Sequence, residues 1–143
     1  MNFIVVDVNV IISSLLSMGD SLNVFILNSI FNKFDFVIPE FFLIELNKHT
    51  EDIQKRSKLS KDEIVGVVEF IMTQINIIPQ SEFEKFTEGA KEILKGHIKD
   101  VPYVALSLKL NCPIFSGDKV LKQLYTEKVL APREMLDKFY NAN

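Results

Sequence analysis

Short, uniformly apolar segments alternate with longer segments that repeat apolar residues at helical spacing. Strands of a parallel sheet read as uniform apolar runs because helices cover both faces. The strand candidates are residues 2–6, 36–38, 75–78, 113–115 and, more weakly, 128–130. No linker, repeat or low-complexity tract separates them. The pattern predicts one domain over residues 1–143, an α/β protein built as a three-layer α/β/α sandwich with a central parallel sheet.

The segments between the strand candidates carry helix signals. The expected helices include residues 21–31, 39–58, 59–74, 81–94, 99–111 and 131–143. Pro39 suits a first helical turn. Ser60 with Glu63, and Ser81 with Glu84, have the Ser-x-x-Glu spacing of a capping box, which predicts helix starts at both places.

Composition narrows the class of protein. With 143 residues, 48% of them apolar and 12 phenylalanines, the chain can fill a sizeable core. Its apolar runs are too short to span a membrane, so we expect a soluble, cytoplasmic protein with no membrane association. The single cysteine, Cys112, allows neither a disulfide framework nor a cysteine-based zinc site, and we expect a buried thiol. The net charge of −3 argues against a broad cationic surface but leaves room for a local one.

Two aspartates stand at equivalent places on different strands. Asp7 ends the first strand candidate, and Asp118 follows the fourth by a turn. The carboxyl ends of parallel strands form the crevice in which ligands bind. If the two strands are neighbours, the two carboxylates repel each other unless a cation lies between them. Mg²⁺ or Mn²⁺ suits such a site because both prefer oxygen ligands.

Two further acids are candidates for the same crevice. Glu45 is embedded in the apolar helical stretch FFLIELNK, and Asp100 precedes the helical stretch VPYVALSLKL. Each also has a structural interpretation. Glu45 could lie on the solvated side of its helix, and Asp100 could be an ordinary N-cap. Asp7 could itself be a turn-forming aspartate.

Three segments resemble the sequence blocks of the PIN-domain nucleases, many of which are VapC-like toxins of toxin–antitoxin pairs. They are IVVDVNVIIS, VIPEFFLIEL and KDVPYVALSLKLNCPIFSGDKVL, which together span nearly the whole chain. The resemblance implies a catalytic and metal-binding acidic set with supporting polar residues beside it. That set is Asp7, Glu45, Asp100 and Asp118, with Asn9 and Ser116 in support.

Two positions depart from the family pattern. Val8 stands where Thr or Ser is usual after the first acid, and Val120 stands where many members carry a further acid. The first change removes a hydroxyl near the expected metal, and the second removes a carboxylate. The four principal acids remain.

The resemblance implies a metal-dependent endoribonuclease that cleaves single-stranded RNA with water activated at the acidic site. It also implies a homodimer and, for a toxin, a small antitoxin partner; the apolar residues 21–31 favour the dimer. Lys119, directly after Asp118, is a weak candidate for binding a substrate phosphate. We expect His49 and His97 to lie on the surface, outside the mechanism.

Two other functions fit part of the pattern. Phosphatases of the haloacid dehalogenase type also place an acid at the end of the first strand, but their second acid is replaced here by Asn9. A degenerate PIN-like module that binds RNA or supports assembly without catalysis is consistent with Val8 and Val120. Cleavage of single-stranded RNA, compared with hydrolysis of a phosphomonoester, would distinguish these possibilities.

Overall fold

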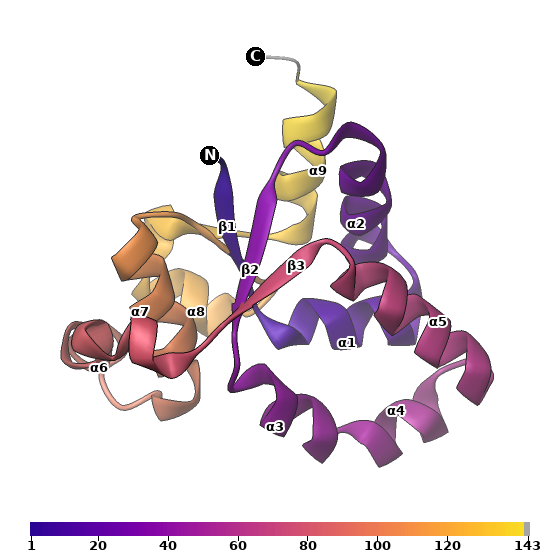
Figure 1. The fold of residues 1–143 in the computed structure, drawn as a ribbon, viewed down its shortest axis with the longest axis horizontal. Helices are drawn as coiled ribbons and strands as arrows, with labels where there is room; N and C mark the ends of the chain where they lie inside the picture. Colours follow the sequence, from indigo (N-terminus) through magenta and orange to yellow (C-terminus); the bar gives the residue numbers. More distant parts are fainter. Residues whose placement is uncertain (142–143) are drawn as a thin grey trace.

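The structure is a computed structural model that describes residues 1–141 (Figure 1). Its five strands form a single all-parallel sheet in the order β3-β2-β1-β4-β5. The strands are β1 (Phe3–Val6), β2 (Asp35–Pro39), β3 (Ile75–Ile78), β4 (Ile114–Phe115) and β5 (Val129–Leu130). The predicted parallel sheet is confirmed, and every strand lies where its apolar run was found.

Helices flank both sides of this sheet, which confirms the predicted sandwich (Figure 1). Figure 1 shows α6 and α7 on one side, with α1, α2 and α5 on the other. The helices are α1 (Val8–Ser17), α2 (Asp20–Phe31), α3 (Phe42–Lys48), α4 (Thr50–Arg56), α5 (Lys61–Met72), α6 (Thr87–Leu94), α7 (Val101–Leu110), α8 (Lys119–Leu124) and α9 (Pro132–Tyr140). The 3₁₀ turns are η1 (Gln80–Glu82), η2 (Glu84–Phe86), η3 (Ile98–Asp100) and η4 (Thr126–Lys128).

An aromatic cluster joins α2 to the sheet. The ring of Phe25 lies 5.4 Å from that of Phe36 on β2 and 5.7 Å from that of Phe115 on β4, centroid to centroid. All three side chains are fully buried. The Phe25–Phe36 pair is edge-to-face and the Phe25–Phe115 pair is tilted, and aromatic pairs contribute about 0.5–1.5 kcal/mol beyond their buried area. The cluster packs α2 against β2 and β4, two strands of the sheet.

One of the two expected capping boxes forms. The backbone N–H of Ser60 donates to Glu63 Oε1 at 2.9 Å, and the N–H of Glu63 donates to Ser60 Oγ at 3.2 Å, so α5 begins as predicted. The helix expected from Ser81 is wrong, because 3₁₀ turns occupy residues 80–86 and α6 begins at Thr87. Phe83, 2% exposed, is buried in the core there, and its burial overrides the local capping signal.

The helix expected over residues 39–58 also differs from the structure. Pro39 ends β2, pairing with Ile78, where its missing N–H costs little. The following segment is divided at His49 into α3 and α4. The Cys112 thiol is buried as expected, and burial raises its pKa to about 11.

Within residues 1–141, no single helix is long and apolar enough to cross a membrane. Helices α1 and α2 reach the required length and composition only as a pair, and they are bent by 105° at the break between them.

Candidate active site

The ends of β1 and β4 lie side by side at the carboxyl edge of the sheet. Val6 pairs with Phe115, and the backbone N–H of Asp7 donates to the carbonyl of Phe115 at 3.0 Å. Asp7, directly after β1, therefore lies at the same edge of the sheet at which the chain continues from β4 to Asp118. The condition for repulsion between the two carboxylates, that their strands are neighbours, is met.

The Asp7 carboxylate is almost completely buried, at 1% exposure. Its Oδ1 accepts the backbone N–H of Asn9 at 3.0 Å, which makes Asp7 the N-cap of α1. Its Oδ2 accepts the hydroxyl of Ser116 at 2.7 Å. Asp7 thus shapes the strand-to-helix turn and also presents a buried carboxylate at the strand ends.

Ser116 connects the two aspartates. While its hydroxyl donates to Asp7, its Oγ accepts the backbone N–H of Asp118 at 3.1 Å. Asp118 caps α8 with Oδ1, which accepts the N–H groups of Val120 (2.9 Å) and Leu121 (3.1 Å). Asn9 and Asp118 both line one small cavity of about 280 Å³. Asn9, which supports Asp7 through its backbone, therefore also lies near Asp118.

Glu45 reaches the site from α3. Its side chain is half-buried, and Oε1 accepts the hydroxyl of Tyr103 on α7 at 2.6 Å. Tyr103 is 1% exposed, so its position is set by the core. This contact ties the α3 acid to the helix that follows Asp100, and it argues against a simple solvated position for Glu45.

Asp100 ends η3 and stands at the N-terminus of α7. Its side chain makes no capping hydrogen bond to that helix, although it is only 4% exposed. The ordinary N-cap interpretation therefore does not describe it. Burial of this kind disfavours the ionised form of the carboxylate.

The acids disfavour one another's ionised forms. Burial raises the pKa of Asp7, and the Asp118 charge adds to that effect against the hydrogen bonds from Asn9 and Ser116. Burial, followed by the charges of Asp7 and Asp118, raises the pKa of Asp100 to about 6. Burial also raises the pKa of Glu45, and the Asp7 charge contributes, while the Tyr103 hydroxyl opposes it. The carboxylates form one electrostatic cluster, as the repulsion argument from the sequence required.

One lysine acts on this cluster. The charge of Lys99 lowers the pKa values of Asp7, Glu45 and Asp100 against the larger effect of burial. Lys119, singled out from the sequence, is exposed beside Asp118. The sequence analysis did not single out Lys99, whose only distinguishing sequence feature is its position directly before Asp100.

Across residues 1–141, no three His, Cys, Asp or Glu side chains are arranged so that they could hold a metal ion. Asp7 and Asp118 cap helices here, and Glu45 accepts a side-chain hydrogen bond. The donor set nevertheless fits: it is made of carboxylate oxygens, two of its members are deeply buried, and their mutual repulsion favours a bound cation.

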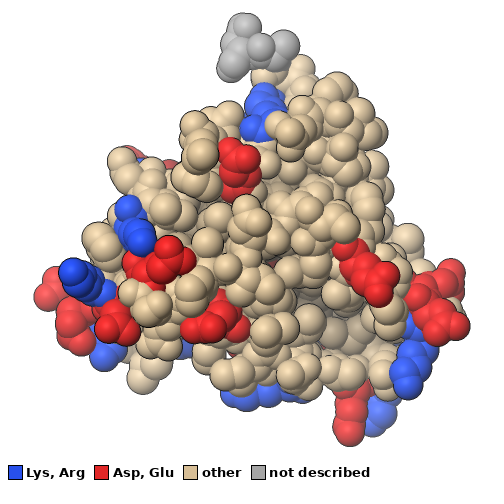
Figure 2. Space-filling model, in the orientation of Figure 1, with Lys and Arg blue, Asp and Glu red and all other residues tan. Residues whose placement is uncertain are grey.

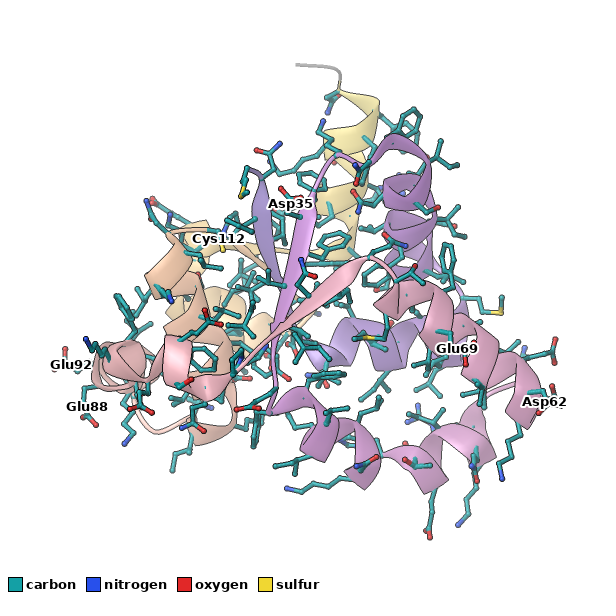
Figure 3. The ribbon with its side chains drawn as sticks, in the orientation of Figure 1. Asp35, Asp62, Glu69, Glu88, Glu92 and Cys112 are labelled. Atoms are coloured by element: carbon teal, nitrogen blue, oxygen red, sulfur yellow. The ribbon has the colours of Figure 1, made fainter. Side chains whose placement is uncertain are left out.

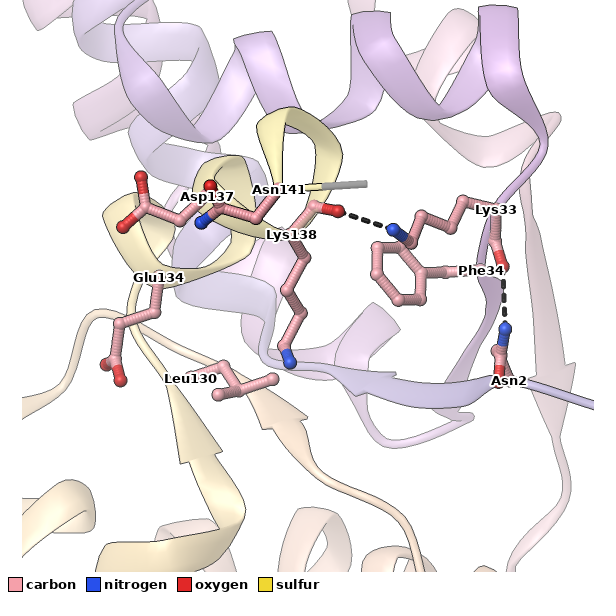
Figure 4. A pocket seen from close by; sticks show the side chains of 8 residues that line it. All are labelled: Asn2, Lys33, Phe34, Leu130, Glu134, Asp137, Lys138 and Asn141. Atoms are coloured by element: carbon pink, nitrogen blue, oxygen red, sulfur yellow. Dashed lines mark hydrogen bonds between the residues drawn. The ribbon is translucent and has the colours of Figure 1, made fainter. Parts of the chain in front are cut away.

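Other acids and cavities lie elsewhere. Figure 3 shows Asp62 and Glu69 on α5 and Glu88 and Glu92 on α6, all at the periphery. A cavity of about 540 Å³ lies at the opposite edge of the sheet (Figure 4). It is lined by Asn2, Lys33, Phe34, Leu130, Glu134, Asp137, Lys138 and Asn141. None of these eight residues belongs to the acidic cluster.

A parallel α/β sandwich with carboxylates at the carboxyl ends of its strands has its candidate ligand site in the crevice at that edge of the sheet. The chain belongs to the PIN domain family, whose model matches residues 5–132. PIN domains are generally nucleases and typically use divalent metals. No curated protein matches the chain.

Proposed function

We propose that this protein is a metal-dependent endoribonuclease that cleaves single-stranded RNA. The observation that carries the proposal is the cluster of Asp7, Glu45, Asp100 and Asp118 at the carboxyl edge of a PIN-domain sheet. These four residues would hold Mg²⁺ or Mn²⁺. When bound, such an ion supplies an activated water and stabilises the negative charge that develops on the phosphate.

The protein's own contribution is to hold the ligands in place. Ser116 and the backbone of Asn9 orient both oxygens of Asp7, and Tyr103 holds one oxygen of Glu45. Partners of this kind set the geometry and basicity of metal ligands. Lys99, exposed directly before Asp100, is the cation that we assign to a substrate phosphate.

The charge distribution favours a local contact with RNA over a broad one. On the face shown in Figure 2, blue and red side chains are interspersed around the periphery, and no continuous cationic patch is present. The net charge of −3 agrees with this. The choice of RNA over DNA rests on the resemblance to VapC-like toxins.

The same resemblance supports a cytoplasmic toxin with a small antitoxin that covers the acidic pocket, and a homodimer. The exposed apolar side chains of Ile26, Ile30 and Phe31 on α2 support the dimer, since they would be shielded in an interface. Light scattering should give twice the monomer mass. A monomer at high micromolar concentration would contradict the dimer.

The activity is tested with a mixed pool of single-stranded RNA. Cleavage should require Mg²⁺ or Mn²⁺, stop in EDTA and be lost in Asp118→Asn. A chromogenic phosphomonoester should not be hydrolysed. Hydrolysis of the phosphomonoester without RNA cleavage would instead support the haloacid dehalogenase-type reaction.

A second candidate is a PIN-like module that binds RNA without cleaving it. It is favoured by Val8, which is fully buried in the core and supplies no hydroxyl to the site. Metal-dependent cleavage would exclude this candidate. RNA binding with no cleavage in either metal would select it.

A further inference from the structure

An apolar groove of about 580 Å³ lies between the start of α3, the 3₁₀ turns before α6, and the start of α7. Its walls include Phe41, Ile44, Phe83 and Ile98, with Glu40 and Lys99 as the charged residues. The volume is within the range of small-molecule sites.

None of the four acids lines the groove, but residues next to Glu45 and Asp100 in the sequence do. Ile44 directly precedes Glu45, and Lys99 and Val101 flank Asp100. A nucleotide chain with one phosphate at the carboxylates would therefore pass the mouth of the groove. The groove and the cluster form neighbouring parts of one surface.

The rim of the groove exposes large apolar side chains. Leu43 is 49% exposed, Ile44 53% and Ile98 74%. Clustered exposure of this kind marks a binding surface. The charged groups are also placed for a ligand, since Glu40 Oε1 is held by the backbone N–H of Gln80 at 2.8 Å.

We propose that this groove binds the base of a nucleotide next to the scissile phosphate of single-stranded RNA. This inference rests on the proposed function and specifies its substrate. An unstacked base presents two apolar faces and a polar edge, and proteins bind such bases on aromatic and apolar side chains. Glu40 supplies an acceptor for an exocyclic amino group, and Lys99 supplies a cation for the adjoining phosphate.

A nucleotide matches the groove better than an apolar protein segment does. The apolar segment would use neither the free carboxylate oxygen of Glu40 nor the ammonium group of Lys99, whereas a nucleotide would use both. A base stacked within a duplex could not enter the groove, so the same contact would select single strands.

The base site can be tested without cleavage by using 2-aminopurine riboside 5′-monophosphate, which has no phosphodiester bond. Its fluorescence should change saturably on binding to the wild type. The double variant Ile44→Ser, Ile98→Ser should bind about tenfold more weakly, the loss expected for one base contact. Val65→Ser is the matched control, because Val65 is 50% exposed on α5, outside the groove. It should bind as the wild type does.

Cleavage supplies the second measurement. An RNA with abasic nucleotides on either side of the scissile position should be cut about tenfold more slowly than the intact RNA by the wild type, and the double variant should not discriminate. Equal cleavage of both RNAs by the wild type would overturn the base site while leaving the nuclease intact. Nucleotide binding without cleavage of any RNA would support the base site and remove the proposed function.

A protein occupant gives a different result. If 8-anilinonaphthalene-1-sulfonate binds the wild type but not the double variant, while the aminopurine nucleotide binds neither, the groove accepts apolar groups and not bases. That outcome would overturn the proposal in favour of an apolar protein segment. Thermal melts confirm that the variants are folded.

Discussion

The hydroxyl of Ser116 donates to Asp7 Oδ2 at 2.7 Å, linking the ends of two neighbouring strands through a buried hydrogen bond. Its partner is a carboxylate whose burial opposes ionisation. The hydrogen bond therefore stabilises the charged form of Asp7. It also positions the oxygen that we assign to metal binding.

Ser116→Ala should destabilise the protein by about 1–3 kcal/mol at pH 7, since a buried carboxylate loses its donor. The loss should shrink at acidic pH, where Asp7 is protonated more often. Urea denaturation in EDTA at both pH values measures this. Ser14→Ala is the control, because Ser14 is equally buried but donates only to the Val10 carbonyl within α1. Equal, pH-independent losses in both variants would argue against a charged Asp7.

Tyr103→Phe should weaken metal binding about tenfold, the effect expected when a residue that orients a ligand is lost. Tyr103 donates to Glu45 Oε1 at 2.6 Å. The dependence of RNA cleavage on Mn²⁺ concentration measures the change, and higher Mn²⁺ should restore the rate. Tyr125→Phe, which alters a hydroxyl 3.1 Å from Ser107 Oγ, should leave the Mn²⁺ dependence unchanged. An unchanged Mn²⁺ dependence in Tyr103→Phe would remove its positioning role.

Without metal, the protein should lose stability as the pH rises. The pKa of Asp100 is raised from 3.8 to about 6 by burial and by the charges of Asp7 and Asp118, so the folded state binds more protons than the unfolded state between these values. The free energy of unfolding therefore falls from about pH 4 to above pH 6, by up to about 3 kcal/mol for this group. Asp100→Asn should flatten that slope in EDTA. A wild-type slope equal to that of the variant would contradict the cluster.

Lys99→Gln should reduce the salt dependence of RNA binding, because one phosphate contact is lost. For single strands, the slope of log K against log salt should become less steep by about 0.7. Fluorescence anisotropy with a labelled oligonucleotide measures this slope. Lys119→Gln is the matched control, because Lys119 is also exposed next to one of the acids, and this variant should leave the slope unchanged. The reverse result would restore Lys119 as the residue that binds phosphate.

The sheet could be predicted closely because uniformly apolar strands and strand-end acids follow from burial and topology alone. The same reasoning placed Asp7 and Asp118 together. Helix starts were less predictable, since Ser60 and Ser81 have the same local signature but only Ser60 caps a helix. At Ser81, the burial of Phe83 overrides the capping signal, and 3₁₀ turns form in place of a helix start.

The site could be predicted only in part. Tyr103 resembles an ordinary core residue in VPYVALSLKL, and only the fold brings it to Glu45, 58 residues away in the sequence. Glu40 was likewise hidden, because its segment was expected to be helical, whereas Glu40 lies in the turn after β2. Lys99 has no sequence signal beyond its position before Asp100, and only the fold places it at the groove.

The most direct test of the central claim is thermal melting of Asp7→Asn with EDTA and with millimolar Mg²⁺ or Mn²⁺. Asn caps a helix as well as Asp does, so the turn is preserved. In EDTA the variant should melt at or above the wild-type temperature, because like-charge repulsion and the burial of a charge are relieved. With metal, the wild type should gain stability, and the variant should gain little and cleave no RNA. Asp35→Asn is the control, because Asp35 begins β2 at the amino-terminal edge of the sheet, away from the acidic cluster. This variant should keep the wild-type metal shift. A metal shift in Asp7→Asn equal to that of the wild type, or full cleavage by this variant, would contradict the proposed site.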